Sequence, residues 1–231
     1  MPIGGKLFKY RNLVDLEQIQ HDLNESREAV TLDGYDFISE FEAKYEEEIL
    51  ELVGFYRYDL LHRYPYHGEE VCAPETKIII YYLWHGEAET YVLIVAPKAI
   101  ANRTAQKFAE ILKPHGDLVE ARFSSRVLRE YAEAQEKTSI VFFDNLDAIN
   151  VEKSALYAGE GGNVAQTNLW GDYLNQGTPW YIMGREKSHG YSVGLVRDGS
   201  VCIFNNVDAR TYYEFVRDEI IDMVLQSHQF N

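Results

Sequence analysis

From residue 89 to residue 144 the chain reads ETYVLIVAP (89–97), KAIANRTAQKFAEILK (98–113), DLVEARFSS (117–125), RVLREYAEAQE (126–136) and KTSIVFFD (137–144). The first, third and fifth segments have the composition of short strands, and the second and fourth have helical spacing of apolar residues. Strands that alternate with helices are typical of a parallel sheet joined by right-handed crossovers. The sequence therefore predicts a parallel βαβαβ section at about residues 89–144.

The rest of the chain adds predicted elements on both sides of this section. Apolar residues recur at steps of three and four in residues 35–62, which predicts a long helix. Residues 77–96 predict a hairpin, and the segment from residue 179 predicts an antiparallel meander with a tight turn at Asp198-Gly199. A further helix is expected from the N-cap Asp208 to residue 226. The expected fold class is α/β (mixed α+β), with a central mixed sheet and flanking helices.

No linker of low-complexity composition interrupts the sequence, so residues 1–231 are predicted to form a single globular domain. Its expected parts are an N-terminal helical elaboration (1–74), the βαβαβ core (75–150), a loop or insertion (145–178) and a C-terminal meander with its helix (179–231). The insertion has no clear period apart from a short helix expected near residues 164–174.

Composition limits the classes of partner and the compartment. The chain has 22 basic and 37 acidic residues, a net charge of −15, and such a field disfavours nonspecific nucleic-acid binding. The two cysteines, Cys72 and Cys202, form no CxxC motif, which indicates a reducing compartment. The first residues contain no apolar segment of signal-peptide length, and no apolar run is long enough to span a bilayer. A soluble, cytoplasmic protein without a membrane partner is expected.

A candidate site follows from the predicted parallel strands. Their carboxyl ends would emerge at one edge of the sheet, where ligands of open α/β sheets bind and where two helix N-termini would point. The basic side chains expected at that edge suit a phosphate or carboxylate group on a small molecule. The residues expected to bind this anionic ligand are Lys98, Asn102, Arg103, Ser124, Ser125, Arg126, Asp144 and Asn145.

Two other functions stay open. Residues 55–66 (FYRYDLLHRYPY) are rich in Tyr and Arg, which are enriched in interface cores, so they predict a protein-interaction or homo-oligomerisation surface without a small ligand. Asp144 and Asp147 would suit a metal-dependent hydrolase or nuclease, although no known metal-ligand motif is present. Glu120 and Arg122 lie on one face of a predicted strand and are expected to form a salt bridge. The sequence identifies no catalytic residue and no cofactor, and it leaves open whether the protein is an enzyme.

Overall fold

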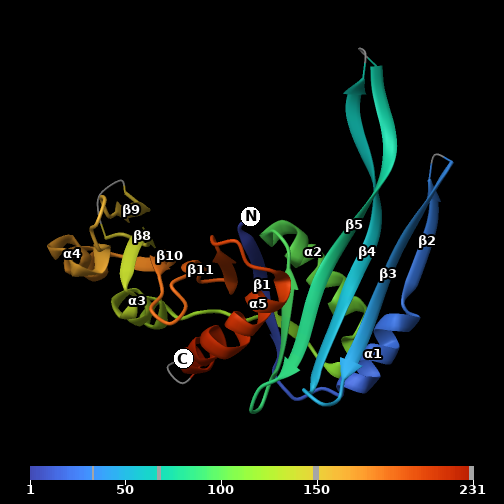
Figure 1. The fold of residues 1–231 in the computed structure, drawn as a ribbon, viewed down its shortest axis with the longest axis horizontal. Coiled ribbons are helices and arrows are strands. Elements are labelled where there is room, and N and C mark those ends of the chain that lie inside the picture. The colour runs from blue at the N-terminus through green and yellow to red at the C-terminus, as the bar shows by residue number, and fades with distance from the viewer. Residues whose placement is uncertain (33, 67–68, 148–150, 229–231) are drawn as a thin grey trace. The chain divides into compact units, whose positions relative to one another are not determined.

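The structure is a computed structural model that describes residues 1–32, 34–66, 69–147 and 151–228 (Figure 1). The chain divides into two compact units. Unit 1 comprises Met1–Leu7 and Glu120–Asn231, and unit 2 comprises Phe8–Val119. The first strand, β1 (Ile3–Tyr10), begins in unit 1 and ends in unit 2. In sequence, unit 2 is therefore an insertion after the first seven residues of unit 1.

Unit 2 is an antiparallel sheet with two helices. Its strands follow the order β2-β3-β4-β5-β6, and each strand is antiparallel to its neighbour. The β5–β6 pair confirms the predicted hairpin, and α2 confirms the helix predicted after it. The described elements of unit 2 are α1 (Leu16–Glu25), β2 (Arg27–Leu32), β3 (Tyr35–Glu46), β4 (Glu51–Tyr66), β5 (Glu69–His85), β6 (Thr90–Val95), α2 (Lys98–Ile111) and a 3-10 turn, η1 (Lys113–His115).

The core of unit 2 lies between α1, α2 and one face of this sheet. Phe108 of α2 packs edge-on against Phe41 of β3 and Tyr81 of β5, with ring centroids 4.9 and 4.8 Å apart. Ile19 and Leu23 of α1 are fully buried in the same cluster. Because each buried side chain of this size stabilises the fold by roughly 1.5–3 kcal/mol, this cluster fixes both helices on one face of the sheet.

The helix predicted over residues 35–62 is wrong, because this segment forms β3, a turn and β4. Aromatic and β-branched residues in this segment favour strands, and residues 40–46 alternate strictly between charged and core positions. Phe41 and Ala43 face the core, whereas Glu42 does not. The helical spacing arose because two strands with a short turn happen to place apolar residues three or four positions apart. Leu50, in the turn, has a φ of 54°, which no regular helix contains.

Beyond the sheet, β4 and β5 continue as a two-stranded ribbon (Figure 1). The pairing of β3 with β4 ends at Ser39 and Tyr58, and the pairing of β6 with β5 reaches only Ile80. Asp59 marks the separation of β3 from β4: one carboxylate oxygen accepts the Ile38 N–H at 2.9 Å and the other accepts the Thr76 hydroxyl at 2.6 Å. A carboxylate thus satisfies the Ile38 amide where the strand ladder stops.

In its described residues, unit 1 contains the C-terminal meander, four α-helices and two short helical turns of other types. Its strand order is β1-β12-β11-β10-β8-β9, so the meander is confirmed and continues on one side into β8 and β9. The C-terminal helix is confirmed too, with Asp208 as its N-cap. The described elements are α3 (Ser125–Ala134), β8 (Lys137–Asp144), β9 (Ser154–Tyr157), η2 (Val164–Gln166), α4 (Asn168–Gln176), β10 (Thr178–Arg185), β11 (Ser192–Val196), β12 (Ser200–Ile203), α5 (Ala209–Phe215), the π-helical turn η3 (Val216–Ile220) and α6 (Ile221–His228).

The predicted parallel βαβαβ section at residues 89–144 is wrong, because all described strands are antiparallel. β6 pairs with β5 in unit 2, β8 pairs with β10 and β9 in unit 1, and β7 (Leu118–Glu120) pairs with β1. The individual strands and helices of the section exist, but the strands are not neighbours. Phe143 packs on Trp170 of α4, whereas Phe142 packs on Trp180 of β10, so β8 is apolar on both faces. This pattern marks burial on two sides and does not specify a parallel partner.

Candidate functional site

The structure assigns the expected ligand-binding residues to two different units. Lys98, Asn102 and Arg103 lie in α2 of unit 2, whereas the other five lie in unit 1, at the start of α3 or at the end of β8. Since the shared strand edge on which the grouping depended does not exist, each group is described within its own unit. Within unit 2, Arg103 is exposed and the side-chain oxygen of Asn102 is buried without a hydrogen bond.

The start of α3 is held firmly in unit 1. The Ser124 hydroxyl caps the helix by accepting the Val127 N–H at 3.2 Å. The Ser124 N–H itself donates to the Ser227 hydroxyl at 2.9 Å, and that hydroxyl donates to the Met223 carbonyl at 2.8 Å. Arg126 is turned to a salt bridge with Glu130, 2.8 Å away on the same helix. The first turn of α3 is therefore positioned by α6.

Asp144, at the end of β8, holds an arginine that the sequence did not single out. Arg197 follows β11, and its guanidinium donates two hydrogen bonds to the Asp144 carboxylate. Nη1 donates to Oδ1 at 3.1 Å, and Nη2 donates to Oδ2. The Arg197 N–H donates to the Trp180 carbonyl at 2.9 Å, which fixes the backbone beside β10. Asn145 has a φ of 52°, a conformation that Asn tolerates, and its amide lies 3.4 Å from Asp144 Oδ1.

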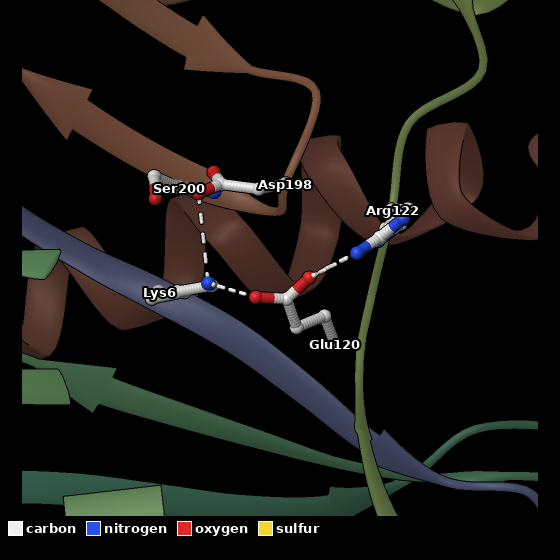
Figure 2. A network of polar contacts seen from close by, with 5 residues as sticks. All are labelled: Lys6, Glu120, Arg122, Asp198 and Ser200. Atoms are coloured by element: carbon white, nitrogen blue, oxygen red, sulfur yellow. Dashed lines mark hydrogen bonds and ion pairs between the residues drawn. The ribbon is translucent and has the colours of Figure 1, made fainter. Parts of the chain in front are cut away.

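A buried lysine links the β11–β12 turn to the chain before α3 (Figure 2). Lys6 of β1 is 0% exposed and forms an ion pair with Glu120 and another, at 3.5 Å, with Asp198. Glu120 also accepts hydrogen bonds from Nε and Nη2 of Arg122, at 3.0 and 2.8 Å. These bonds confirm the predicted Glu120–Arg122 salt bridge. Ser200, beside Lys6 in Figure 2, pairs with it in the β1–β12 register.

Glu120 stays ionised in this network. Its partial burial raises the pKa, but hydrogen bonds from Lys6 and Arg122 outweigh burial and lower the pKa of the Glu120 carboxyl below its ordinary value. Lys6 is thereby given a charged partner, which a fully buried ammonium group requires. In this network the Arg122 guanidinium is paired with Glu120, and the Arg122 side chain is 74% exposed.

Arg122 and Asp198 of this network line a pocket of about 470 Å³ in unit 1, together with Arg197. Ligand pockets of proteins are typically about 300–1,000 Å³, so the space suits a small molecule. Two arginines, Arg122 and Arg197, line it, and each keeps N–H groups beyond those used for its carboxylate partner. The lining residues are Arg122, Phe123, Ser124, Ser125, Arg197 and Asp198.

The pocket brings together only part of the expected set. Ser124 and Ser125 line it, whereas Asp144 does not line it but forms an ion pair with the lining residue Arg197. The expected binding set lacked Arg122, Arg197 and Asp198, which line the pocket, and Lys6, which pairs with Asp198. The turn signal Asp198-Gly199 was visible and is confirmed by a φ of 86° at Gly199, but nothing local tells which segment faces that turn.

The metal-site hypothesis gains no geometric support. Among the residues that the structure describes, no group of three or more His, Cys, Asp or Glu side chains could hold a metal ion. Asp144 is bound by Arg197, and Asp147 is an exposed residue whose N–H donates to the Gln176 carbonyl at 2.7 Å. A metal ion at Asp144 would have to displace a bidentate guanidinium.

A second hollow lies on the unit 2 sheet, on the face away from the core. It measures about 220 Å³ and is lined by Glu40, Glu42, Phe55, Arg57 and Ile78. Phe55 is 43% exposed and Ile78 is 61% exposed. Residues 55–66, the expected interaction segment, are part of β4 and run from this hollow into the ribbon. Exposed apolar side chains beside a protruding ribbon are typical of interaction surfaces.

No protein-family model matches the chain, and no curated protein matches it. Within the described residues, no helix is long and apolar enough to cross a membrane. The two hollows are therefore the features from which a function can be inferred.

Proposed function

We propose that unit 1 binds a small ligand through an anionic group, a carboxylate or a phosphate, in the pocket between Arg122 and Arg197. The observation that carries this proposal is the convergence of two arginines on one pocket, each already oriented by a carboxylate. Guanidinium groups that are held in place lose little side-chain entropy on binding, and their planar N–H groups match the oxygens of carboxylates and phosphates.

The serine residues at the start of α3 complement the two arginines. Ser124 and Ser125 line the same pocket, and the first backbone N–H groups of a helix favour negative charge. This contribution is secondary, because the Ser124 hydroxyl is already engaged as the N-cap. The proposal involves binding and assigns no catalytic residue.

A thermal-shift screen of carboxylates, sugar phosphates and nucleotides at low salt tests the proposal. We expect at least one anion to raise the melting temperature, because a ligand that binds only the folded state stabilises it. Arg197→Lys keeps the charge beside Asp144 but loses the planar fork, so it should weaken binding by about tenfold. Arg210→Lys, at an exposed arginine paired with Glu214, is the matched control and should bind like wild type. The absence of any shift with any anion would refute the proposal.

A second function, self-association through β4 and β5, is favoured by one specific observation. Residues 55–66 continue from a sheet into a two-stranded ribbon, and such ribbons are marginally stable without further packing. Ile78→Ser should lower a concentration-dependent molar mass measured by light scattering after gel filtration. Val30→Ser is the matched control, since Val30 and Ile78 are both 61% exposed. A monomeric wild type at all concentrations would exclude this function.

We also propose that the protein works in the cytoplasm. Support comes from its low cysteine content, two in the whole chain. Cell fractionation with an antibody against the protein tests this, and recovery outside the cytoplasmic fraction would contradict it.

A further inference from the structure

The hollow on the unit 2 sheet has an apolar part and is smaller than a typical small-molecule site. Its volume is about 220 Å³, whereas ligand pockets are typically about 300–1,000 Å³. Phe55 and Ile78 supply the apolar part, and they are 43% and 61% exposed. The space therefore suits one long side chain of a protein partner better than a whole small molecule.

One carboxylate at the hollow has no compensating charge. Glu42 of β3 lies directly opposite Phe55 of β4 in the strand register. Its side chain is exposed and forms no ion pair within the part of the chain that the structure describes. Arg57 also lines the hollow, but it is ion-paired with Glu40. A negative charge thus stands beside exposed apolar surface and is open to a cation from a partner.

The charge of unit 2 as a whole favours a basic partner. Residues 8–119 contain 11 Lys or Arg and 21 Asp or Glu, so unit 2 carries a net charge of −10 out of the −15 of the chain. A field of this sign speeds the encounter with basic surfaces and disfavours like-charged ones. A second copy would bring the same negative charge to the hollow, so a basic partner is the better complement.

We infer that the unit 2 hollow is a docking site for a basic segment of a partner protein, in which a lysine or arginine stands next to an apolar residue. The aliphatic stem of the basic side chain packs against Phe55 and Ile78, and its charged end pairs with Glu42. This docking site does not depend on the anion pocket of unit 1. It shares Ile78 with the proposed self-association surface, so a second copy is the rival occupant.

Three capped synthetic peptides test the inference by calorimetry with the full chain at neutral pH and low salt. The first contains glycine, lysine and leucine, the second has glutamate in place of lysine, and the third has glycine in place of leucine. The lysine–leucine peptide should bind about tenfold more tightly than the glutamate peptide and about threefold more tightly than the peptide without leucine. If it does not bind, or if either of the other peptides binds as tightly, the inference is overturned.

Variants whose circular dichroism matches that of wild type locate the site. Glu42→Gln should weaken binding of the lysine–leucine peptide about threefold, as expected for an exposed ion pair. Glu47→Gln removes the same charge from the β3–β4 turn and should leave the affinity unchanged. Ile78→Ser should weaken binding about fivefold, whereas Val30→Ser, at an equally exposed residue, should not. If each variant has the same effect as its control, the peptide is held only by general attraction to an acidic protein, and the inference is overturned.

Two further measurements separate this docking site from the proposed functions. Arg197→Lys, in unit 1, should bind the lysine–leucine peptide like wild type; a loss of binding would place the peptide in unit 1 and overturn the inference. Glu42→Gln removes repulsion between two acidic copies, so it should strengthen self-association at the hollow while it weakens peptide binding. A wild type that self-associates through Ile78, more strongly in Glu42→Gln, and binds no peptide supports self-association and overturns the inference.

Discussion

Replacing Lys6 with methionine tests how unit 1 is held together around the pocket. The side chain of Lys6 is 0% exposed, and its ammonium group is ion-paired with Glu120 and Asp198. Methionine fills a similar volume without the charge. The substitution therefore leaves two carboxylates facing an apolar group where a cation stood, and we expect unit 1 to lose stability.

The size of the loss follows from how far water can reach these carboxylates. Breaking a fully buried ion pair by removing one partner costs about 3–5 kcal/mol. Glu120 is 31% exposed and Asp198 is 18% exposed, so water re-solvates part of each group. We therefore expect Lys6→Met to lower the free energy of unfolding by about 2–3 kcal/mol at neutral pH.

The effect should shrink in acid. Burial raises the pKa of the Glu120 carboxyl, but the hydrogen bonds from Lys6 and Arg122 outweigh burial. The pKa of Glu120 in the folded protein therefore lies below its ordinary value of 4.5. A carboxyl with a lowered folded pKa contributes stability above its unfolded pKa, and this stability is lost as the pH falls through the folded pKa. Without Lys6, the ionised Glu120 carboxylate contributes less stability, so less stability is lost when it is protonated. The stability difference between wild type and Lys6→Met should therefore narrow as the pH falls below about 4.5.

Urea unfolding followed by circular dichroism measures both quantities. Lys153→Met is the control, because it removes the same charge from an exposed position of unit 1. If Lys6→Met is no more destabilising than this control, or if its difference from wild type widens on acidification, Lys6 does not hold unit 1 together as described.

Three further substitutions test local claims. Ser124→Ala removes the N-cap of α3 and should cost about 1 kcal/mol in the free energy of unfolding, whereas Ser125→Ala should cost much less; equal costs would contradict the capping assignment. Gly54→Ala would push a Cβ against the Glu42 carbonyl and the Tyr81 hydroxyl, so it should destabilise unit 2 by about 1–3 kcal/mol. The control Gly159→Ala places its Cβ where no atom lies within 4 Å and should be near neutral. Similar melting temperatures for the two variants would show that the close approach at Gly54 is absent. Asp59→Ala leaves the Ile38 N–H without its acceptor, so it should speed hydrogen exchange of that amide at neutral pH and lower the free energy of unfolding by about 1–2 kcal/mol. Glu47→Ala, in the β3–β4 turn, should do neither. Unchanged exchange at Ile38 would contradict the role of Asp59 at the end of the β3–β4 ladder.

Local signals in the sequence predicted local structure well. The Asp198-Gly199 turn and the N-cap Asp208 each act within a few residues, and the structure contains both. The helix predicted over residues 35–62 failed because its spacing was judged over the whole segment. The strict alternation around Phe41 and Ala43 was the informative signal.

Strand partners were beyond the reach of local patterns. β8 pairs with β10, and Val141 lies opposite Ile182, some forty positions along the chain. Its two apolar faces fit a parallel or an antiparallel neighbour equally well. The same difficulty applies to the site: Ser124 and Asp144 were named from their positions at element ends, but Arg197 and Lys6 reach the pocket region only through strand pairing with distant segments.

The central claim, that Arg122 and Arg197 together bind an anion, is tested most directly by their own side-chain N–H signals. In a ¹H–¹⁵N spectrum of arginine Nε–H groups, titration with benzoate should move the Arg122 and Arg197 signals along one saturating curve. The signals of Arg210 and Arg217, which are ion-paired with Glu214 and Asp218, should stay in place. Equal, unsaturating shifts at all four arginines, or no shift at Arg122 and Arg197 with benzoate or any other anion, would contradict the claim.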